Sequence, residues 1–293
     1  MFSKILIATD SSPSSLSVVG CARSLRAIGA KECVLAQCFT IREHVPFPHQ
    51  IKAYIESMLN QQKEILEKDG LVTTVVVDAG LPGTLIPRMA AERGCSMIVV
   101  GSHGHNLVSE IFLGGTATAI LHHATRPILI VRLKADKETG HAICAGEGCD
   151  FTRHVLYVTD FSDHAQRAFA YVGELVAAGA RRVTLLHVQD QTRLDTHLED
   201  RLAEFNAIDR ERLEMLKARL EEMGDAEIAM EVPYGSPIDE ILKRTREGRT
   251  GLVVMGTHGR GFVSELFLGS VSHNVARHSE APVLLIPGQR EDT

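Results

Sequence analysis

The residues best suited to chemistry in this 293-residue chain form a glycine-rich loop. Gly256, His258 and Gly259 follow an apolar run, and ten residues after Gly259 the pair Gly269 and Ser270 opens a helical pattern. Glycines let the backbone turn sharply and bring main-chain N–H groups close to an anion, and a helix N-terminus presents unpaired N–H groups at a positive dipole end. The spacing predicts a phosphate-binding loop built mostly from backbone.

Two serines add hydroxyl groups to this loop. Ser270 could donate a hydrogen bond to a phosphate oxygen, and Ser272 could do the same one step along the first helical turn. Serine is also preferred as a helix N-cap, so Ser270 could simply cap the helix. The two roles are compatible.

The chain contains an internal repeat. Residues 4–10 return as residues 154–160, and residues 101–114 return as residues 256–269 with nine of fourteen positions identical. The segment between the copies is charged and Gly-rich without an apolar period, which is typical of a linker. We therefore predict a domain over 1–134, a linker over 135–150 and a second domain over 151–293.

Asp160 ends the first apolar run of the second copy, directly after Thr159. A carboxylate at a strand end can accept ribose hydroxyls or help to hold a metal such as Mg²⁺, or it can cap the following helix. The ligand role is favoured because the first copy has the same pair, Thr9 and Asp10, at the corresponding place.

Each copy alternates short β-branched runs with longer helical patterns, which indicates βαβ units and a parallel sheet covered on both faces. We expect four helices per copy, and one of them, over 194–223, carries an apolar stripe suited to packing on the sheet. Ligands of such sheets bind beyond the carboxyl ends of the strands, where the strand order reverses. The five strands expected in each copy lie near 4–9, 32–39, 71–78, 96–101 and 127–132, and near 153–159, 182–189, 226–232, 251–256 and 282–287.

The spacing of the glycine motif, coupled to an aspartate that ends the first strand, resembles the universal stress protein family in its ATP-binding subclass, over nearly the whole chain. The resemblance implies an α/β fold with two tandem Rossmann-like domains of the adenine nucleotide alpha hydrolase-like type, each with five parallel strands and helices on both faces. It further implies bound ATP or AMP, with the adenine against the first two strands. Pairing of the two last strands would make an internal pseudo-dimer, and a homodimer of whole chains is compatible with it.

Carried over position by position, the resemblance implies that Asp160 contacts the adenosine, that the Val188 backbone contacts the adenine, and that the glycine loop holds the phosphates. The residues implied in the second copy are Thr159, Asp160, Val188, Met255, Gly256, His258, Gly259, Gly269, Ser270, Val271 and Ser272.

The first copy keeps most of this pattern. Its corresponding residues are Thr9, Asp10, Cys38, Val100, Gly101, His103, Gly104, Gly114, Gly115 and Thr116. Gly115 stands where the family has a hydroxyl residue, with Thr116 as a partial replacement, and Cys38 stands where a valine is expected at the adenine. We predict that the first copy binds more weakly, or prefers a nucleotide with fewer phosphates.

The six cysteines are spread unevenly in a chain large enough to fold without disulfide bonds. We therefore interpret them as reduced thiols in a cytoplasmic protein. Cys21 is expected to pack in the core. His141, Cys144 and Cys149 are weak candidates for a metal site, because the gap of four residues between the cysteines is loose and a Gly-rich linker is poorly preorganised. No metal is predicted.

Composition excludes several function classes. The net charge of −6 argues against a general nucleic-acid binder, and the sequence has no run near the ~20 apolar residues of a membrane span and no signal-peptide core. His103 and His258 occupy the same loop slot, but neither copy has a P-loop lysine, so no catalytic residue is assigned. A non-catalytic sensor or regulator is the leading interpretation. The alternatives are a slow ATPase, or an interaction module with a vestigial nucleotide pocket in the first copy.

Overall fold

The computed structural model describes residues 2–40, 48–103, 113–135, 142–144, 149–192, 202–247, 250–259 and 268–288. The chain divides into two compact units, which we call domain 1 (Met1–Cys149, with the last five residues) and domain 2 (Asp150–Gly288). Each is described below by itself.

Domain 1 is built on a parallel sheet with the strand order β5-β4-β1-β2-β3. Its helices connect these strands, as parallel pairing requires. The strands are β1 (Lys4–Ala8), β2 (Glu32–Phe39), β3 (Val72–Ala79), β4 (Met97–Gly101) and β5 (Ile128–Val131). The helices are α1 (Pro13–Val19), α2 (Ala22–Ala27), α3 (Pro48–Lys68), α4 (Pro82–Glu92) and α5 (Gly115–His123).

Domain 2 repeats this arrangement in the order β11-β9-β8-β13-β14. A separate short parallel pair, β10 (Gln189–Asp190) with β12 (Tyr234–Gly235), follows the strands β9 and β11 in the chain. The strands are β8 (Val155–Val158), β9 (Arg182–Leu186), β11 (Glu227–Glu231), β13 (Leu252–Gly256) and β14 (Val283–Ile286). The helices are α6 (Asp163–Ala177), α7 (Leu202–Glu221), α8 (Pro237–Arg246) and α9 (Ser270–His278).

The predicted fold class is confirmed, and every expected strand is found within three residues of its predicted bounds. The first strand of each domain is central, because β1 pairs with both β2 and β4, and β8 pairs with both β9 and β13. Strand order therefore reverses beside β1 in domain 1 and beside β8 in domain 2. These are the two switch points at which ligands of such sheets bind.

Two features of domain 1 differ from expectation. Its first helix is split into α1 and α2 at Gly20, where Val18, Val19 and Gly20 combine low helix propensities. The segment expected as an irregular linker contains β7 (Ala142–Cys144), which pairs antiparallel with β6 (Leu133–Ala135). A three-residue strand is too short to give a periodic signal in the sequence.

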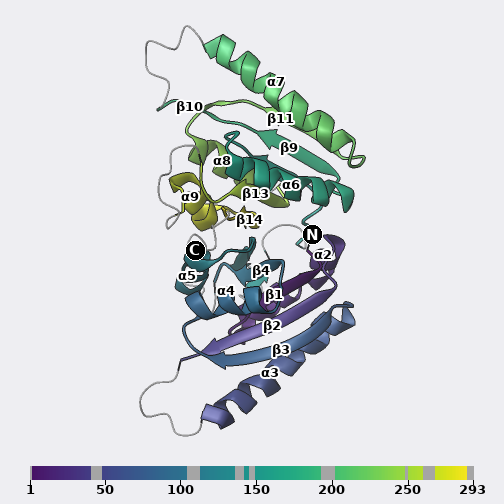
Figure 1. Ribbon diagram of the computed structural model, residues 1–293, viewed down its shortest axis with the longest axis vertical. Helices are drawn as coiled ribbons and strands as arrows, with labels where there is room; N and C mark the ends of the chain where they lie inside the picture. The colour runs from purple at the N-terminus through teal and green to yellow at the C-terminus, as the bar shows by residue number, and fades with distance from the viewer. Residues whose placement is uncertain are drawn as a thin grey trace. The chain divides into compact units, whose positions relative to one another are not determined.

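The helices α3 and α7 are the longest described, and Figure 1 shows each running beside an outer strand of its own domain, β3 and β11 respectively. The first part of the helix expected over 194–223 lies outside the described residues, and α7 begins at Leu202. Among the described helices, none combines the length and apolar character needed to cross a membrane.

Tyr157 anchors β8 to the helix that follows it. Its side chain is buried, its hydroxyl donates to the Ala165 carbonyl oxygen at 2.8 Å, and its ring packs on Phe169. Burial raises the pKa of the phenol above its ordinary value. The contact fixes α6 over the carboxyl end of β8, where the candidate site lies.

The close packing of α4 on α5 yields a test. A Cβ added at Gly83 would lie 2.7 Å from the Ala119 Cβ, whereas one at Gly115 would meet nothing within 4 Å. Gly83→Ala should lower the free energy of unfolding by about 1–3 kcal/mol through overpacking. Gly115→Ala should leave it unchanged or raise it by at most about 1 kcal/mol through helix propensity. Urea unfolding followed by circular dichroism measures both, and equal midpoints for the two variants would contradict the close helix approach.

Candidate functional site

A cavity of about 660 Å³ opens at the switch point of domain 2. Its walls come from the carboxyl ends of β8, β9 and β13, the first half of α7, and the N-terminal turns of α8 and α9. The volume falls within the range of about 300–1,000 Å³ that small-molecule sites occupy.

The structure brings all the residues predicted from the second copy together around this cavity. They come from four separate stretches of the chain, each of which follows a strand or opens a helix. The predicted residues that line the cavity are Thr159, Asp160, Val188, Met255, Gly256, His258, Gly259, Gly269, Ser270, Val271 and Ser272.

The Asp160 carboxylate uses its two oxygens differently. Oδ1 accepts hydrogen bonds from the Ser162 N–H at 3.1 Å and the Ser162 hydroxyl at 2.6 Å, and Ser162 in turn caps α6. Oδ2 faces Gly259, where an added Cβ would lie 2.6 Å away. Asp160 thus holds the N-cap residue Ser162 in place but does not itself cap α6, and Gly259 is the residue that lets the loop approach the carboxylate.

The serines at the start of α9 do not behave as the sequence suggests. The N-cap is Gly269, and Ser270 is the first helical residue, so the alternative of Ser270 as the N-cap is wrong. Ser270 is exposed. Ser272 is buried, and its hydroxyl donates to the carbonyl oxygens of Thr257 at 2.6 Å and Gly269 at 2.9 Å. Its proton thus locks the loop to the helix and is not directed at a ligand.

His258 is held in a defined orientation beside the loop. Its Nδ1 lies 2.9 Å from the Thr257 hydroxyl, and its ring is 5.2 Å from the His164 ring. Burial, with the neighbouring charge of Arg167 and the His258 ring, lowers the pKa of His164. Burial above all therefore favours an uncharged His164 at neutral pH.

Sequence reasoning missed the wall that α7 contributes. Phe205, Ile208, Asp209 and Arg212 line the cavity, whereas Leu213 and Leu220 of the same helix are fully buried. The apolar stripe expected on this helix thus contributes both to the buried core and to the wall of the cavity. An apolar period alone does not distinguish a face that packs on a sheet from one that faces a ligand cavity.

Asp209 organises this wall. Its carboxylate accepts from the Gln189 amide at 3.2 Å, lies 3.4 Å from His187 Nε2 and pairs with Arg212 at 3.5 Å. His187 Nδ1 lies 2.8 Å from the Thr159 carbonyl oxygen, so the network connects α7 to the ends of β8 and β9. These contacts give the far side of the cavity a fixed polar rim.

Phe161 closes the turn after β8. Its φ is +60°, and its N–H donates to the Thr159 hydroxyl at 3.0 Å. The ring lies 4.6 Å from the His187 ring, and the Arg212 guanidinium lies 5.2 Å from its centroid. Ser11 has the same left-handed conformation after Asp10 in domain 1, so both copies keep this strained turn.

Domain 1 keeps this turn, but different side chains surround the end of its first strand, β1. Asp10 accepts from the Ser12 N–H at 3.0 Å, as Asp160 does from Ser162. The buried Gln62 of α3 accepts from the Thr9 hydroxyl at 2.9 Å and donates to the Ser15 hydroxyl at 3.0 Å. The end of β1 is therefore bridged to α3 by a side chain of the protein itself.

The other predicted residues of domain 1 occupy the corresponding places. His103 Nδ1 lies 2.9 Å from the Ser102 hydroxyl, Gly114 is the N-cap of α5, and Gly115 and Thr116 are exposed at its first turn. Val100 is buried in β4, which ends at Gly101, and Cys38 lies half-buried near the end of β2. Gly104 lies outside the described residues.

The weak metal candidates fall into two groups. His141 lies outside the described residues. Cys144 and Cys149 are described, and the structure joins Cys149 by disulfide bonds to Cys21 and to Cys144, which differs from the reduced thiols expected for these three cysteines. Cys21 is buried, as expected, but is not an isolated core thiol.

Comparison with known proteins identifies what the chain is similar to. The chain matches the Universal stress protein family over residues 1–132 and again over 152–287. A universal stress protein of Mycolicibacterium smegmatis is 28% identical over 225 residues, covering 75% of this chain and 70% of that protein. One of Methanocaldococcus jannaschii is 30% identical over 153 residues, which cover 46% of this chain and 94% of that protein. The crystal structure of a universal stress protein from Archaeoglobus fulgidus superposes with a TM-score of 0.75 at 23% identity, covering 97% of this chain and 98% of that one.

Cys38 provides a pH-dependent test of the domain 1 site. Burial, and to a lesser extent the Asp78 carboxylate, raise the pKa of this thiol to about 11. Because the thiolate is the reactive form, alkylation at pH 8 should be about 100-fold slower than for a thiol of ordinary pKa, and should rise about tenfold per pH unit up to pH 11. Peptide mapping after iodoacetamide pulses measures the rate, with urea-unfolded protein as the control. A rate that levels off near pH 9 would contradict this environment.

Proposed function

Because the chain belongs to the universal stress protein family in both of its halves, we propose that domain 2 binds an adenine nucleotide, ATP or AMP, in the cavity at its switch point. We further propose that the protein acts as a non-catalytic sensor or regulator in a stress response. Bound nucleotide would hold a conformation that a partner recognises.

One observation carries the proposal. The Gly256–Gly259 turn and the N-terminus of α9 open on the same cavity as a rim of fixed acceptors and aromatic rings. Backbone N–H groups at a helix N-terminus suit phosphate, and side chains such as Gln189 and Asp160 suit a nucleoside. The cavity thus offers both kinds of surface that a nucleotide needs.

The charges around the cavity favour one orientation of the nucleotide. The carboxylates of Asp190 and Asp209 line the sides formed by β10 and α7, where negative phosphates would be repelled. The phosphates would therefore lie over Gly256, Gly259 and Ser270, with the adenine toward Val188. Asp160 Oδ2 would accept a ribose hydroxyl or help to hold Mg²⁺.

A catalytic function is less well supported than binding. Among the described residues that line the cavity there is no lysine, and Arg212 is paired with Asp209 and stacked on Phe161. Stabilising a transferring phosphoryl group calls for such cations. A slow ATPase activity with His258 near the terminal phosphate is the second candidate function.

Domain 1 would bind nucleotide more weakly. It lacks the Ser270 hydroxyl, because Gly115 stands there, and Gln62 already bridges the strand end to α3. A vestigial pocket that serves a protein partner is the alternative for this domain. A cytoplasmic location, an internal pseudo-dimer and a homodimer stay predictions.

The first test identifies the ligand and its site. Freshly purified protein is denatured and the released nucleotides are identified by chromatography and mass spectrometry, and stripped protein is then titrated with ATP and AMP by calorimetry. Asp160→Asn keeps an oxygen that can accept from Ser162 but removes the charge, so it should weaken binding by about tenfold to a hundredfold. Asp10→Asn is the matched control and should leave the tighter site unchanged. If wild-type protein releases no nucleotide and takes up neither ATP nor AMP, the binding proposal is wrong.

A reciprocal exchange tests the difference between the domains. Ser270→Ala should lower the affinity of the tighter site about tenfold or more, because a hydrogen bond to a charged group is lost. Gly115→Ser should strengthen the weaker site by restoring that hydroxyl. Calorimetry with a two-site fit measures both, and equal affinities of the two wild-type sites would show that the hydroxyl does not set the difference.

A further inference from the structure

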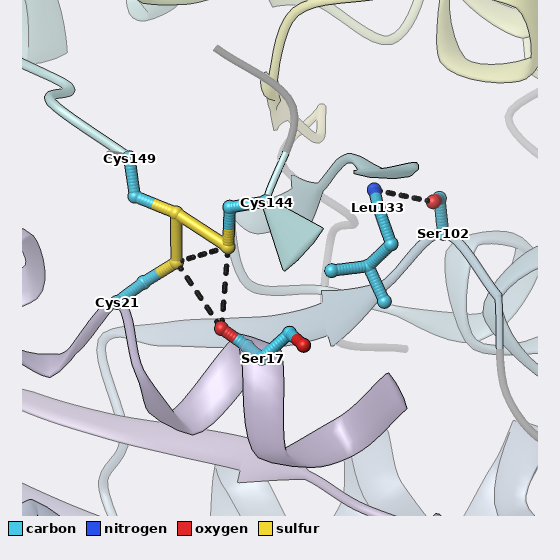
Figure 2. Close-up of a disulfide and its surroundings, with 6 residues drawn as sticks. All are labelled: Ser17, Cys21, Ser102, Leu133, Cys144 and Cys149. Atoms are coloured by element: carbon cyan, nitrogen blue, oxygen red, sulfur yellow. Dashed lines mark hydrogen bonds between the residues drawn. A yellow bond between two sulfur atoms is a disulfide. The ribbon is translucent and has the colours of Figure 1, made fainter. Parts of the chain in front are cut away.

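We propose that Cys21, Cys144 and Cys149 form a binding site in domain 1 for a soft metal ion, of which zinc is the most available. Figure 2 shows the three cysteines converging, each from a different stretch of chain, with the Cys149 sulfur bonded to both of the other sulfurs. The Cys21 and Cys144 sulfurs are 2.7 Å apart, and the Cys149 sulfur lies against both. This inference does not depend on nucleotide binding.

The fold brings these cysteines together over a long stretch of sequence. Cys21 sits between α1 and α2, and Cys144 ends β7, opposite Leu133 of β6. The Leu133 N–H donates to the Ser102 hydroxyl at 3.1 Å, which ties β6 to the end of β4 (Figure 2). Cys149 then returns to the cluster with a φ of +59°. The hairpin that the sequence did not reveal is thus what positions Cys144.

The number of sulfurs favours a metal over a disulfide. The Cα separations of 5.7 Å for Cys21 with Cys149 and 6.0 Å for Cys144 with Cys149 suit a disulfide as well as a shared metal ion. However, a sulfur atom forms only one disulfide, so any pairing leaves a third thiol pressed against the bond. A central ion uses all three sulfurs, and three thiolates are a ligand set that zinc prefers.

The cluster must open to accept the ion, because all three sulfurs lie closer together than the ligands of one zinc ion do. Zinc–sulfur bonds of about 2.3 Å in a tetrahedron place sulfurs roughly 3.8 Å apart, so Cys21 and Cys144 would separate by about 1 Å. Cys21 and Cys149 are buried, whereas Cys144 is only half-buried and leaves access from solvent. Among the described residues the cluster offers these three ligands, and a water would complete the tetrahedron.

The protons of the thiols have a nearby acceptor. The Ser17 carbonyl oxygen lies 3.2 Å from the Cys144 sulfur and 3.5 Å from the Cys21 sulfur. Zinc binds the thiolates, so these protons leave when the ion enters, and affinity should rise with pH. A bound ion would hold β7 on α1, the helix that begins just after Asp10.

The experiment counts zinc on the full-length protein. Protein is reduced, stripped with a chelator, given one equivalent of Zn²⁺, desalted and analysed by elemental mass spectrometry. Wild type should retain stoichiometric zinc, and Cys144→Ala and Cys149→Ala should each retain at least about tenfold less at a fixed concentration of competing chelator. Cobalt(II) in place of zinc should give a thiolate charge-transfer band that both variants lose. Cys95→Ala, a buried free cysteine outside the cluster, is the matched control and should retain zinc as wild type does.

Thermal unfolding separates loss of the site from loss of the fold. Zinc should raise the melting temperature of wild type and of Cys95→Ala but leave that of Cys144→Ala unchanged, because a ligand stabilises only a state that binds it. Failure of reduced wild type to retain zinc overturns the proposal, as does equal loss in Cys95→Ala. A disulfide that persists under reductant, seen as the loss of two hydrogen masses in the intact protein, overturns it as well.

Discussion

The carboxylate at the end of β8 constrains everything around the cavity of domain 2. One oxygen of Asp160 accepts the Ser162 N–H and so holds the N-cap residue of α6, across a turn that is left-handed at Phe161. The other oxygen lies so close to the loop after β13 that residue 259 has no space for a side chain. The start of a helix, the choice of glycine and the shape of the cavity are therefore set by one side chain. A substitution there acts on folding and on the site together.

Much of this architecture could be predicted because its signals are local or repeated. The strands were recognisable in the sequence as β-branched runs. The internal duplication identified both glycine loops and both Thr-Asp pairs. The role of α7 was not predictable, because Phe205 and Ile208 belong to the same apolar stripe as the buried Leu213. Cys21 gave no signal either, since its partner Cys144 lies 123 residues away and is positioned by a three-residue strand. The role of Ser272 at the start of α9 was also not predictable, because a hydroxyl near a helix start can bond to the backbone as well as to a ligand.

The two domains show how a duplicated scaffold diverges without changing its sheet. Both keep the central first strand and the turn after it, because these determine whether the helix that follows can form. The residue that approaches from the long helix differs: Gln62 bonds to Thr9 in domain 1, whereas Asp209 bonds to Gln189 and pairs with Arg212 in domain 2. Domain 1 also carries the three-cysteine cluster.

Tyr157, which anchors β8 under α6, also gives the molecule an optical property. The chain has four tyrosines and no tryptophan, so the near-ultraviolet spectrum comes from few chromophores. Tyr54 and Tyr234 are exposed, whereas Tyr157 is buried with a raised phenol pKa. Because the unfolded chain releases that proton near pH 10, domain 2 loses stability as the pH rises above this value. The phenolate absorbance of Tyr157 therefore appears at a lower pH in the unfolded chain than in the folded domain, which makes this residue an intrinsic reporter of the integrity of domain 2.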